Sequence, residues 1–220
     1  MDCIRVRKIG RIIKIGNTYG RIIISCYVDD LLIGVSKNAL EQWKIDKSKL
    51  ASIYKIKDIG LCQWILNMAV EQNQDVDGTI SVSQEKYINE IVEKYEMTNA
   101  NVCATPSVVN PLTKLQIDSA VPLSKKDHET YRSIVGACSY AAITTRIDIA
   151  YAVNKCAQAL ASPTTNDMIA IKRVVRYLKG TSKYKLVFGK NGLIVIVIPI
   201  GVVQVIIWIV KVQVVLLLMC

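Results

Sequence analysis

Two short apolar runs on either side of an aspartate pair constrain the fold of this chain more than any other feature. Residues 21–26 and 31–35 have the length and the β-branched or aliphatic composition of strands. Asp29 and Asp30 lie between them, and such a pair suits the turn of a β-hairpin. A rigid hairpin tip can also present two carboxylates to divalent metal ions, which prefer oxygen ligands. For the dipeptide alone, an ordinary turn is the more common explanation.

The charge and the cysteine content narrow the function classes. A net charge of +10 and a pI near 9.2 suit a polyanionic partner such as nucleic acid. The seven cysteines contain no Cys-x-x-Cys spacing and His128 is the one histidine, so we expect no zinc site. Arg5, Arg7 and Arg11 interrupt the N-terminal region, which lacks a signal-peptide pattern. We therefore expect an intracellular protein, cytoplasmic or nuclear.

The first part of the chain predicts strands around one helix. We expect a strand at residues 3–9 and, after the hairpin, a helix capped by Asn38 with Glu41 in its first turn. Its mostly apolar face is predicted from residues at helical spacing: Leu40, Trp43, Lys47, Leu50 and Tyr54. Residues 56–60 are expected to end the helix and lead into a strand at 64–70.

The next segments continue this pattern and then become helical. Residues 75–78 have the composition of a hairpin turn, and 79–83 predict an alternating strand that is polar on one face. Ser83 is predicted to cap a helix. The buried face of that helix is predicted from its apolar spacing: Tyr87, Ile88, Ile91, Val92 and Tyr95.

The sequence between the predicted helix at 83–97 and the apolar last thirty residues predicts a loop followed by helices. Residues 107–127 contain two prolines and no strong periodicity, which indicates a connector. Two packed amphipathic helices follow, and Asp148 is expected to cap the second. A basic amphipathic helix then ends at Gly180.

The string Tyr27-Val28-Asp29-Asp30 resembles the catalytic hairpin of reverse transcriptases, in the form found in copia-type retrotransposon polyproteins. Further stretches resemble the same family in the same order between about residues 20 and 189: Ile56-Lys-Asp-Ile-Gly60, Trp64-Ile-Leu-Asn-Met68, Ser83-Gln-Glu-Lys-Tyr-Ile88, Tyr131-Arg-Ser-Ile-Val-Gly136, Thr145-Arg-Ile-Asp148 and Lys172-Arg-Val-Val-Arg-Tyr-Leu-Lys-Gly-Thr181. Their common order is why we identify the chain as a member of that family.

The resemblance implies an α+β fold with a partial palm sheet that carries the hairpin, followed by helical thumb and connection segments. Residues 1–75 would be the C-terminal part of the palm, and 76–106 a thumb-like strand and helix. Residues 107–190 would be a mainly helical connector, and 191–220 an apolar tail.

The resemblance also implies a chemistry. The family copies RNA into DNA with Mg²⁺, for which Mn²⁺ can substitute, using a template-primer and dNTPs. Asp29 and Asp30 would be the catalytic metal ligands, and Tyr27 and Val28 would line the primer end. The rest of the Pol polyprotein, including its integrase and RNase H, would be the protein partner.

Further residues are assigned by the resemblance to substrate and nucleic acid. Lys57 would lie near the incoming triphosphate, although a solvated surface lysine explains it better. Trp64 and Asn67 belong to the segment that supports the primer end. The basic positions of the last helix could meet phosphates, and a solvated helix face explains them equally well: Lys172, Arg173, Arg176 and Lys179.

Several positions depart from the family pattern. Asn67 replaces a Gly, Ile147 replaces a Pro, and Asp167-Met168 replaces His-Trp. A palm also needs a further metal-binding carboxylate from an earlier strand, and Asp2 is the one acidic residue before Asp29. We therefore expect a fragment that is inactive by itself. The alternatives are a working polymerase that is one piece of a longer product, and a non-enzymatic basic protein that binds nucleic acid or a membrane.

The last thirty residues have a composition of their own. Sixteen of them are Val or Ile, and the stretch 193–210 has transmembrane length. A shift of reading frame offers another explanation, because Val (GTN) and Ile (ATN) codons then become the NGT and NAT codons of polar residues. In that frame the tail resembles the start of the family's RNase H domain. We interpret 191–220 as an out-of-frame translation rather than a membrane anchor, and we expect the chain alone to be poorly soluble.

Overall fold

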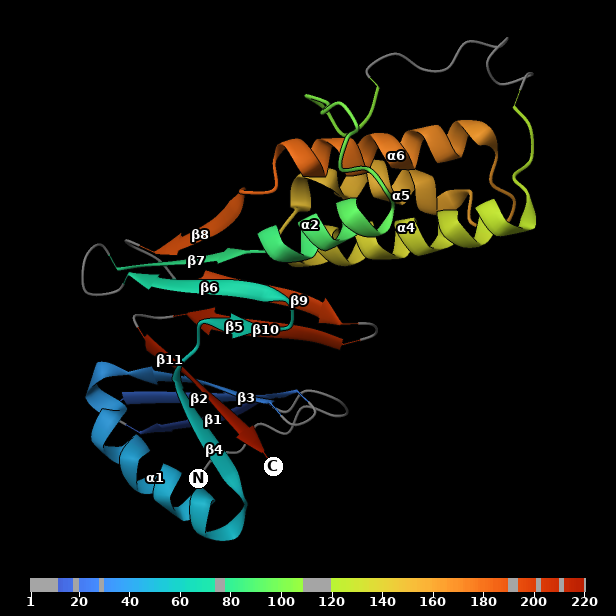
Figure 1. Cartoon of the computed structure of the whole chain (residues 1–220). Coiled ribbons are helices and arrows are strands. Elements are labelled where there is room, and N and C mark those ends of the chain that lie inside the picture. The colour runs from blue at the N-terminus through green and yellow to red at the C-terminus, as the bar shows by residue number, and fades with distance from the viewer. Residues whose placement is uncertain are drawn as a thin grey trace. The chain divides into compact units, whose positions relative to one another are not determined.

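The computed structural model describes residues 12–17, 20–27, 30–73, 78–108, 120–189, 194–200, 203–209 and 212–219 (Figure 1). The chain divides into two compact units. The sheet unit is drawn from Met1–Leu66, Val70–Ser81 and Val187–Cys220. The helical unit is drawn from Asn67–Ala69 and Val82–Leu186. The mixture of sheet and helix agrees with the predicted α+β class. The predicted strand at 3–9 lies outside the described residues.

The sheet unit contains a five-stranded sheet in the order β1-β2-β3-β11-β4. Each neighbouring pair is antiparallel. The strands have these bounds: β1 Ile12–Asn17, β2 Gly20–Tyr27, β3 Asp30–Ser36, β4 Ile56–Leu61 and β11 Val212–Met219. The first four strands come from the start of the chain, whereas β11 comes from the apolar tail and lies between β3 and β4.

One face of this sheet packs against helix α1 (Leu40–Ile53), which follows a 3₁₀ turn η1 (Lys37–Ala39). The buried cluster between them joins strand and helix residues: Ile22, Ile24, Ile33, Val35, Ala39 and Trp43. Gly20 is required by this packing, because a Cβ there would lie 2.7 Å from the Cβ of Ala39. Burial of this apolar face supplies the main free energy that holds α1 to the sheet.

The other described strands form two smaller sheets. The hairpin β9 (Ile194–Ile200) and β10 (Val203–Ile209) forms a two-stranded antiparallel sheet from the apolar tail. A four-stranded sheet has the order β5-β6-β7-β8 and contains the segments where the chain passes from one unit to the other. Its strands have these bounds: β5 Trp64–Ile65, β6 Met68–Asn73, β7 Thr79–Ser83 and β8 Lys185–Gly189.

In the described part of the helical unit, four α-helices pack around one buried cluster. Their bounds are α2 Glu85–Lys94, α4 Lys125–Thr144, α5 Ala150–Gln158 and α6 Thr165–Gly180, with a 3₁₀ turn η2 at Ile147–Ile149. The predicted apolar face of α2 is confirmed, because Ile88, Ile91 and Val92 are buried. Tyr131 is fully buried and its hydroxyl donates to the carbonyl oxygen of Cys156 at 2.6 Å, which ties α4 to α5.

The predicted helix caps were wrong at three positions. Asn38 lies inside η1 and Ala39 is the residue before α1. Gln84, not Ser83, precedes α2, and its side chain does not cap the helix. Asp148 lies in η2, and its carboxylate pairs with Arg146 instead of capping α5. In the last two cases a long-range or buried partner competes with the local cap.

Three strand and helix predictions also need correction. Tyr54 follows the end of α1 and is 55% exposed, so it does not belong to the buried face. Residues 56–60 form most of β4 itself rather than a lead into a later strand. The predicted strand at 64–70 is two strands joined by a turn at 66–67. The alternating strand predicted at 79–83 is present as β7, and its Ser81 is buried and donates to Glu71 at 2.9 Å.

The apolar tail forms β-strands in its described part. No helix within the described ranges has the length and apolarity needed to cross a membrane. The frame-shift interpretation of residues 191–220 stays a prediction, because it concerns codons.

Candidate functional site

Three of the residues singled out from the sequence lie in one row across the sheet of the sheet unit. Tyr27 of β2 is the register partner of Asp30 of β3. Asp30 is in turn opposite Leu218 of β11, and Leu218 is opposite Lys57 of β4. Adjacent strands are about 4.8 Å apart, so the backbones of Asp30 and Lys57 are separated by about 10 Å.

This row faces away from α1. Along β3 the alternate residues Ile33 and Val35 pack against the helix, which puts Asp30 on the other face. In β4 the same alternation holds, because Asp58 pairs with Lys47 of α1 at 2.5 Å and Lys57 is exposed. The strand period of two therefore brings the carboxylate, the ammonium and the phenol to one side of the sheet.

The aspartate pair is described in part. Asp30 begins β3 and is half-buried, whereas Val28 and Asp29 lie outside the described residues. The pairing of Tyr27 with Asp30 leaves two residues between the strand ends, which is the loop length of a tight hairpin. Within the described part of the chain, no three His, Cys, Asp or Glu side chains come together as a metal site.

The segment after β4 lies within electrostatic range of Asp30. Cys62 is 1% exposed, and burial together with the nearby Asp30 carboxylate raises the pKa of its thiol to about 11. Its thiol donates weakly to the carbonyl of Trp64, and its own carbonyl accepts from the Gln72 amide at 3.0 Å. Trp64 is 40% exposed beside this anchor. Sequence reasoning missed Cys62, because a lone buried cysteine has no local signal.

The backbone conformation at position 67 explains why asparagine is tolerated there. Leu66 and Asn67 have φ values of 48° and 58°, which is the left-handed region, and they form the turn between β5 and β6. Glycine adopts this conformation most easily and asparagine tolerates it better than most residues. Asn67, which stands where glycine was expected, is therefore compatible with this turn, and its side chain is exposed.

The basic positions of α6 have different surroundings. Lys179 donates to the carbonyl oxygens of Thr98 and Ala100 at 2.6 and 2.8 Å, and Arg173 donates to the Thr105 hydroxyl at 2.9 Å. These two cations thus hold the segment that follows α2. Lys172 is exposed and Arg176 is half-buried. Contact of these four side chains with nucleic acid stays a prediction.

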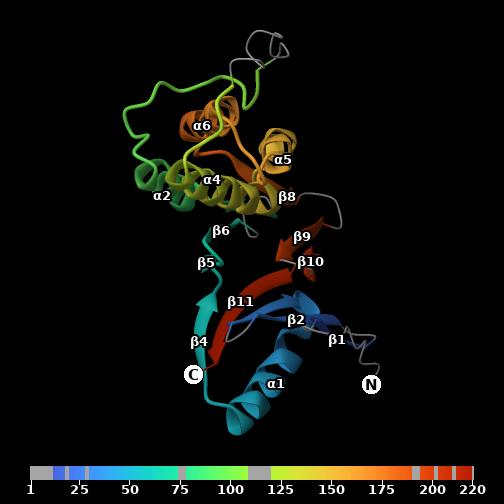
Figure 2. The same ribbon diagram turned by 90° about the vertical axis from the view of Figure 1, so that its right-hand side faces the viewer.

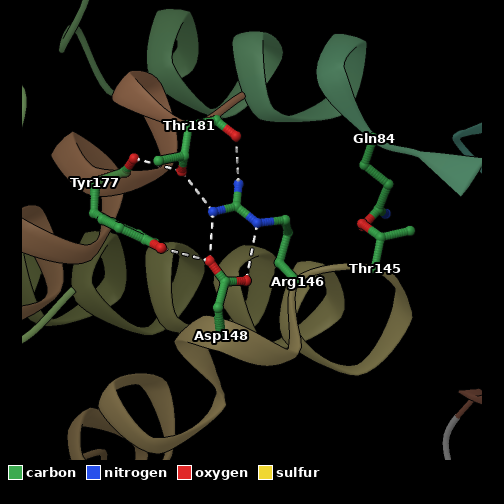
Figure 3. A network of polar contacts seen from close by, with 6 residues as sticks. All are labelled: Gln84, Thr145, Arg146, Asp148, Tyr177 and Thr181. Carbon is green, nitrogen blue, oxygen red and sulfur yellow. Dashed lines mark hydrogen bonds and ion pairs between the residues drawn. The ribbon is translucent and has the colours of Figure 1, made fainter. Parts of the chain in front are cut away.

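Two of the sequence motifs meet in the helical unit around Arg146, which is 1% exposed (Figure 3). Its guanidinium donates to both carboxylate oxygens of Asp148 at 3.0 and 2.7 Å. It also donates to the carbonyl and hydroxyl oxygens of Thr181 at 3.1 and 2.5 Å. The rings of Tyr177 and Tyr184 lie 5.5 and 5.4 Å from it. We call these five residues the arginine cluster.

Asp148 is the charged partner within the arginine cluster. The Tyr177 hydroxyl donates to its Oδ2 at 2.8 Å. Burial alone would raise the pKa of this carboxyl, but the hydrogen bonds from Arg146 and Tyr177 outweigh it and hold the pKa below its usual value. The arrangement connects the end of α4 to the end of α6, and the four hydrogen bonds from Arg146 indicate a structural role.

Gln84 makes the second long-range contact between motifs (Figure 3). It is fully buried, and its side-chain amide lies 2.5 and 2.7 Å from the hydroxyls of Thr144 and Thr145. The Thr144 hydroxyl also lies 2.7 Å from the Tyr140 carbonyl oxygen. The Oε1 of Gln84 accepts from both threonine hydroxyls, which ties the residue before α2 to the end of α4.

A comparison with protein families gives the family of the chain. The model of the reverse transcriptase (RNA-dependent DNA polymerase) family matches residues 7–109, which include Tyr27, Asp30 and Lys57. The retrovirus-related Pol polyprotein from transposon TNT 1-94 of Nicotiana tabacum is 36% identical over 171 residues, 76% of this chain. The chain belongs to the retrotransposon reverse transcriptase family.

Other relatives agree with membership of the reverse transcriptase family. The Pol polyprotein from transposon RE1 of Arabidopsis thaliana is 34% identical over 166 residues, 76% of this chain. An uncharacterised mitochondrial protein of the same plant is 35% identical over 167 residues, again 76% of this chain. The chain spans 13% of the TNT 1-94 polyprotein, 11% of the RE1 polyprotein and 65% of the mitochondrial protein. No solved structure matches it.

Proposed function

We propose that this chain carries part of the nucleotidyl-transfer site of a reverse transcriptase. The observation that carries the proposal is the row of Tyr27, Asp30 and Lys57 on one face of the sheet, within the segment matched by the family. Carboxylate oxygens are the ligands that Mg²⁺ prefers, so Asp30 and the adjacent Asp29 have the right chemistry to bind it, or Mn²⁺. The bound ion would activate the primer hydroxyl and stabilise the leaving pyrophosphate.

The other residues of the row have roles that follow from their chemistry. Lys57 is an exposed cation about two strands from Asp30, which suits an interaction with the triphosphate of an incoming dNTP. The Tyr27 ring offers an apolar surface for the primer end, next to Val28. A template-primer and dNTPs would be the substrates, and the rest of a Pol polyprotein the protein partner.

We further propose that the chain alone does not extend a primer. In the described part of the chain, no third metal-binding side chain comes together with Asp30. The carboxylates of Asp29 and Asp30 alone would therefore leave the coordination of a metal ion incomplete. Asp29 and Asp30 thus have the side chains that the catalytic chemistry of the family requires. Catalysis also needs a further carboxylate from another segment.

The test compares the chain alone with a chimera. Residues 7–109 replace the corresponding segment of an active retrotransposon reverse transcriptase, and primer extension is measured with Mg²⁺ and with Mn²⁺. We expect extension by the chimera, background levels for Asp29→Asn/Asp30→Asn in the chimera, and background levels for the chain alone. The matched control Glu41→Gln/Asp46→Asn removes the same charge on α1 and should keep the activity. Equal extension by the Asn pair and its parent would overturn the catalytic assignment.

A further inference from the structure

A segment that lies outside the helices and strands follows helix α6 in the helical unit (Figure 2). We call this segment, residues 98–107 after α2, the strap. Lys179 of α6 donates to two backbone carbonyl oxygens of the strap at 2.6 and 2.8 Å. At Gly180 an added Cβ would lie 3.1 Å from the Cβ of Val102, so the strap approaches the end of the helix closely. A cation and packing therefore both hold the strap to α6.

The later part of the strap meets the arginines of α6 at Thr105. The Nη2 of Arg173 donates to the Thr105 hydroxyl at 2.9 Å, and this hydroxyl donates to the Ser107 carbonyl oxygen at 2.9 Å. Arg176 is three residues further along α6, on the same side of the helix as Arg173. The Nε atoms of both arginines are buried and have no hydrogen-bond partner among the described residues. Buried donors in this condition are rare in native proteins, so they call for an explanation.

The geometry at Arg173 is half of a pattern that is complete elsewhere in the chain. The Nε and Nη2 of an arginine lie on one edge of its guanidinium, and this edge can donate two parallel hydrogen bonds to one acceptor group. At Arg146 the edge donates to both carboxylate oxygens of Asp148, at 3.0 and 2.7 Å. At Arg173 the same edge contacts a single oxygen, that of Thr105. A group with several oxygens on Thr105 would engage both donors.

The charges around this contact favour an anionic group. Helix α6 contains four cations and one carboxylate, Asp167, which accepts from the backbone N–H and the hydroxyl of Thr164. The strap contains no acidic residue. Among the described residues, neither Arg173 nor Arg176 forms an ion pair. The two guanidinium charges are therefore not balanced by a carboxylate of the described chain.

Thr105 itself has the features of an acceptor for a phosphoryl group. Its side chain is exposed, and Pro106 follows it. A residue before proline prefers an extended backbone, and one class of protein kinases selects a proline directly after the serine or threonine that it modifies. We propose that Thr105 is a phosphorylation site, and that Arg173 and Arg176 bind its phosphate.

The modification needs ATP and a proline-directed protein kinase as co-reactants. The hydroxyl oxygen of Thr105 forms a bond to the γ-phosphorus of ATP, and the bond from that phosphorus to its bridging oxygen breaks. ADP leaves with the electron pair of that bond, and the hydroxyl proton passes to the catalytic aspartate of the kinase. No oxidant or reductant is involved.

Phosphorylation exchanges one contact of Thr105 for stronger ones. The modified oxygen has no proton, so the hydrogen bond to the Ser107 carbonyl is lost. The phosphate carries about −1.5 to −2 charges at pH 7 and three acceptor oxygens, which suit the two-donor edge of Arg173 and the charge of Arg176. The strap is thereby fixed to α6. This site is independent of the polymerase proposal, because it lies in the helical unit and involves none of Tyr27, Asp30 and Lys57.

The chain contains its own matched control. Ser162-Pro163 is the other Ser/Thr-Pro dipeptide of the sequence, and Ser162 is exposed. The full chain carrying Ser162→Ala is treated with a proline-directed kinase and ATP, and the product is mapped by mass spectrometry. The chain carrying Thr105→Ala is treated in the same way to give phosphate on Ser162 alone. We expect one phosphate on Thr105 in the first chain, and its absence there would overturn the modification site.

Titration of the two phosphorylated chains by ³¹P NMR tests whether the arginines bind the phosphate. Nearby guanidinium groups favour the dianion, so the second pKa of the phosphate on Thr105 should be lower than that on Ser162 by at least about 0.5 pH unit. The two values should agree in urea, where the contacts are lost. Equal values in the folded chains would overturn the proposal.

Urea unfolding followed by circular dichroism gives the second readout. Phosphate on Thr105 should lower the equilibrium constant for unfolding of the helical unit by about tenfold, as charge-assisted hydrogen bonds do. Phosphate on Ser162 should change it by less than about twofold, because it gains no such partner. A twofold or smaller effect at Thr105 would contradict the fixing of the strap to α6.

Two further variants identify the cation that matters. Arg173→Lys keeps the charge but lacks the two-donor edge, so it should remove most of the difference between the two phosphates. Lys172→Gln removes a charge from an exposed position of the same helix and should leave the difference unchanged. If Arg173→Lys instead weakens binding of a single-stranded oligonucleotide by the unmodified chain and does not change the phosphate titration, Arg173 serves nucleic acid and the proposal is overturned.

Discussion

Arg146 determines much of the local structure of the helical unit at the scale of single residues. A guanidinium that is 1% exposed must find partners for its donors, and it finds them in Asp148 and Thr181. Because Arg146 follows α4 and Thr181 follows α6, the cluster joins segments that are far apart in the chain. Arg146 and Thr181 both belong to stretches by which the sequence resembles its family, so these stretches include residues with a structural role.

Asp148→Asn should destabilise the helical unit by about 3 kcal/mol, because it leaves the Arg146 charge buried without a counter-charge. The pKa of Asp148 is lowered in the folded state, so its contribution is present above the unfolded pKa and is lost as the pH falls through the lower folded pKa. Urea unfolding at pH 7 and at pH 3 measures both effects. The Asn variant should lose less stability between these two pH values than the parent.

The control for this variant is Glu129→Gln on the exposed side of α4, which removes the same charge without a buried partner. We expect it to change the free energy of unfolding by less than about 0.5 kcal/mol. A stability of Asp148→Asn within that range would contradict the role given to the arginine cluster.

At the scale of elements, two glycines differ in the space around them, and this difference determines which of them alanine can replace. Gly136 lies within α4, where an added Cβ meets no atom within 4 Å. Gly189 ends β8 with a φ of 129°, and an added Cβ would overlap the Gly78 carbonyl oxygen and lie 2.8 Å from the Thr79 Cα. The same change therefore has opposite consequences in the two elements.

Gly136→Ala should stabilise the chain by about 0.5–1 kcal/mol, because alanine loses less backbone entropy in a helix. Gly189→Ala should destabilise it by about 2 kcal/mol or more, because a left-handed glycine and a close backbone approach are both disturbed. Chemical denaturation of both variants measures the difference. Equal effects of the two substitutions would contradict this packing of β7 and β8.

Local patterns in the sequence predicted the elements better than their ends. The apolar spacing of Ile88, Ile91 and Val92 was sufficient for α2, since a helix face repeats within a few residues. The caps at Ser83 and Asp148 failed, since Gln84 and Arg146 contact residues that a local window does not contain. The place of β11 was beyond prediction for the same reason, because strand pairing is not local.

For the candidate site, the sequence likewise predicted individual residues but not their arrangement. The motif resemblance singled out Tyr27, Asp30 and Lys57, whereas their common row follows from the register across β11. Cys62 was missed beside Asp30, because its relation to that carboxylate exists only after folding. The roles of Asp29 and Val28 stay predictions, since both lie outside the described residues.

At the scale of the whole molecule, the two units have separate cores and should unfold separately. The three tryptophans, Trp43, Trp64 and Trp208, all belong to the sheet unit, whereas four of the five α-helices in the described part belong to the helical unit. Tryptophan fluorescence and far-ultraviolet circular dichroism thus report mainly on different units.

We expect the fluorescence and circular dichroism transitions to occur at different urea concentrations. Asp148→Asn should move the circular dichroism transition to lower urea and leave the fluorescence transition within error of the parent. Coincident transitions that move together in this variant would show one cooperative unit instead of two.

The position of β11 also affects the order in which the chain folds as it is made. A ribosome releases the segment that forms the helical unit, residues 82–186, before it releases Val212–Met219. The helices can therefore pack during synthesis, whereas β3 and β4 wait with open edges for a strand from the other end of the chain. Contacts of such long sequence separation form slowly, and exposed edges aggregate meanwhile. The sheet unit should thus depend on chaperones at the time when the helical unit no longer does.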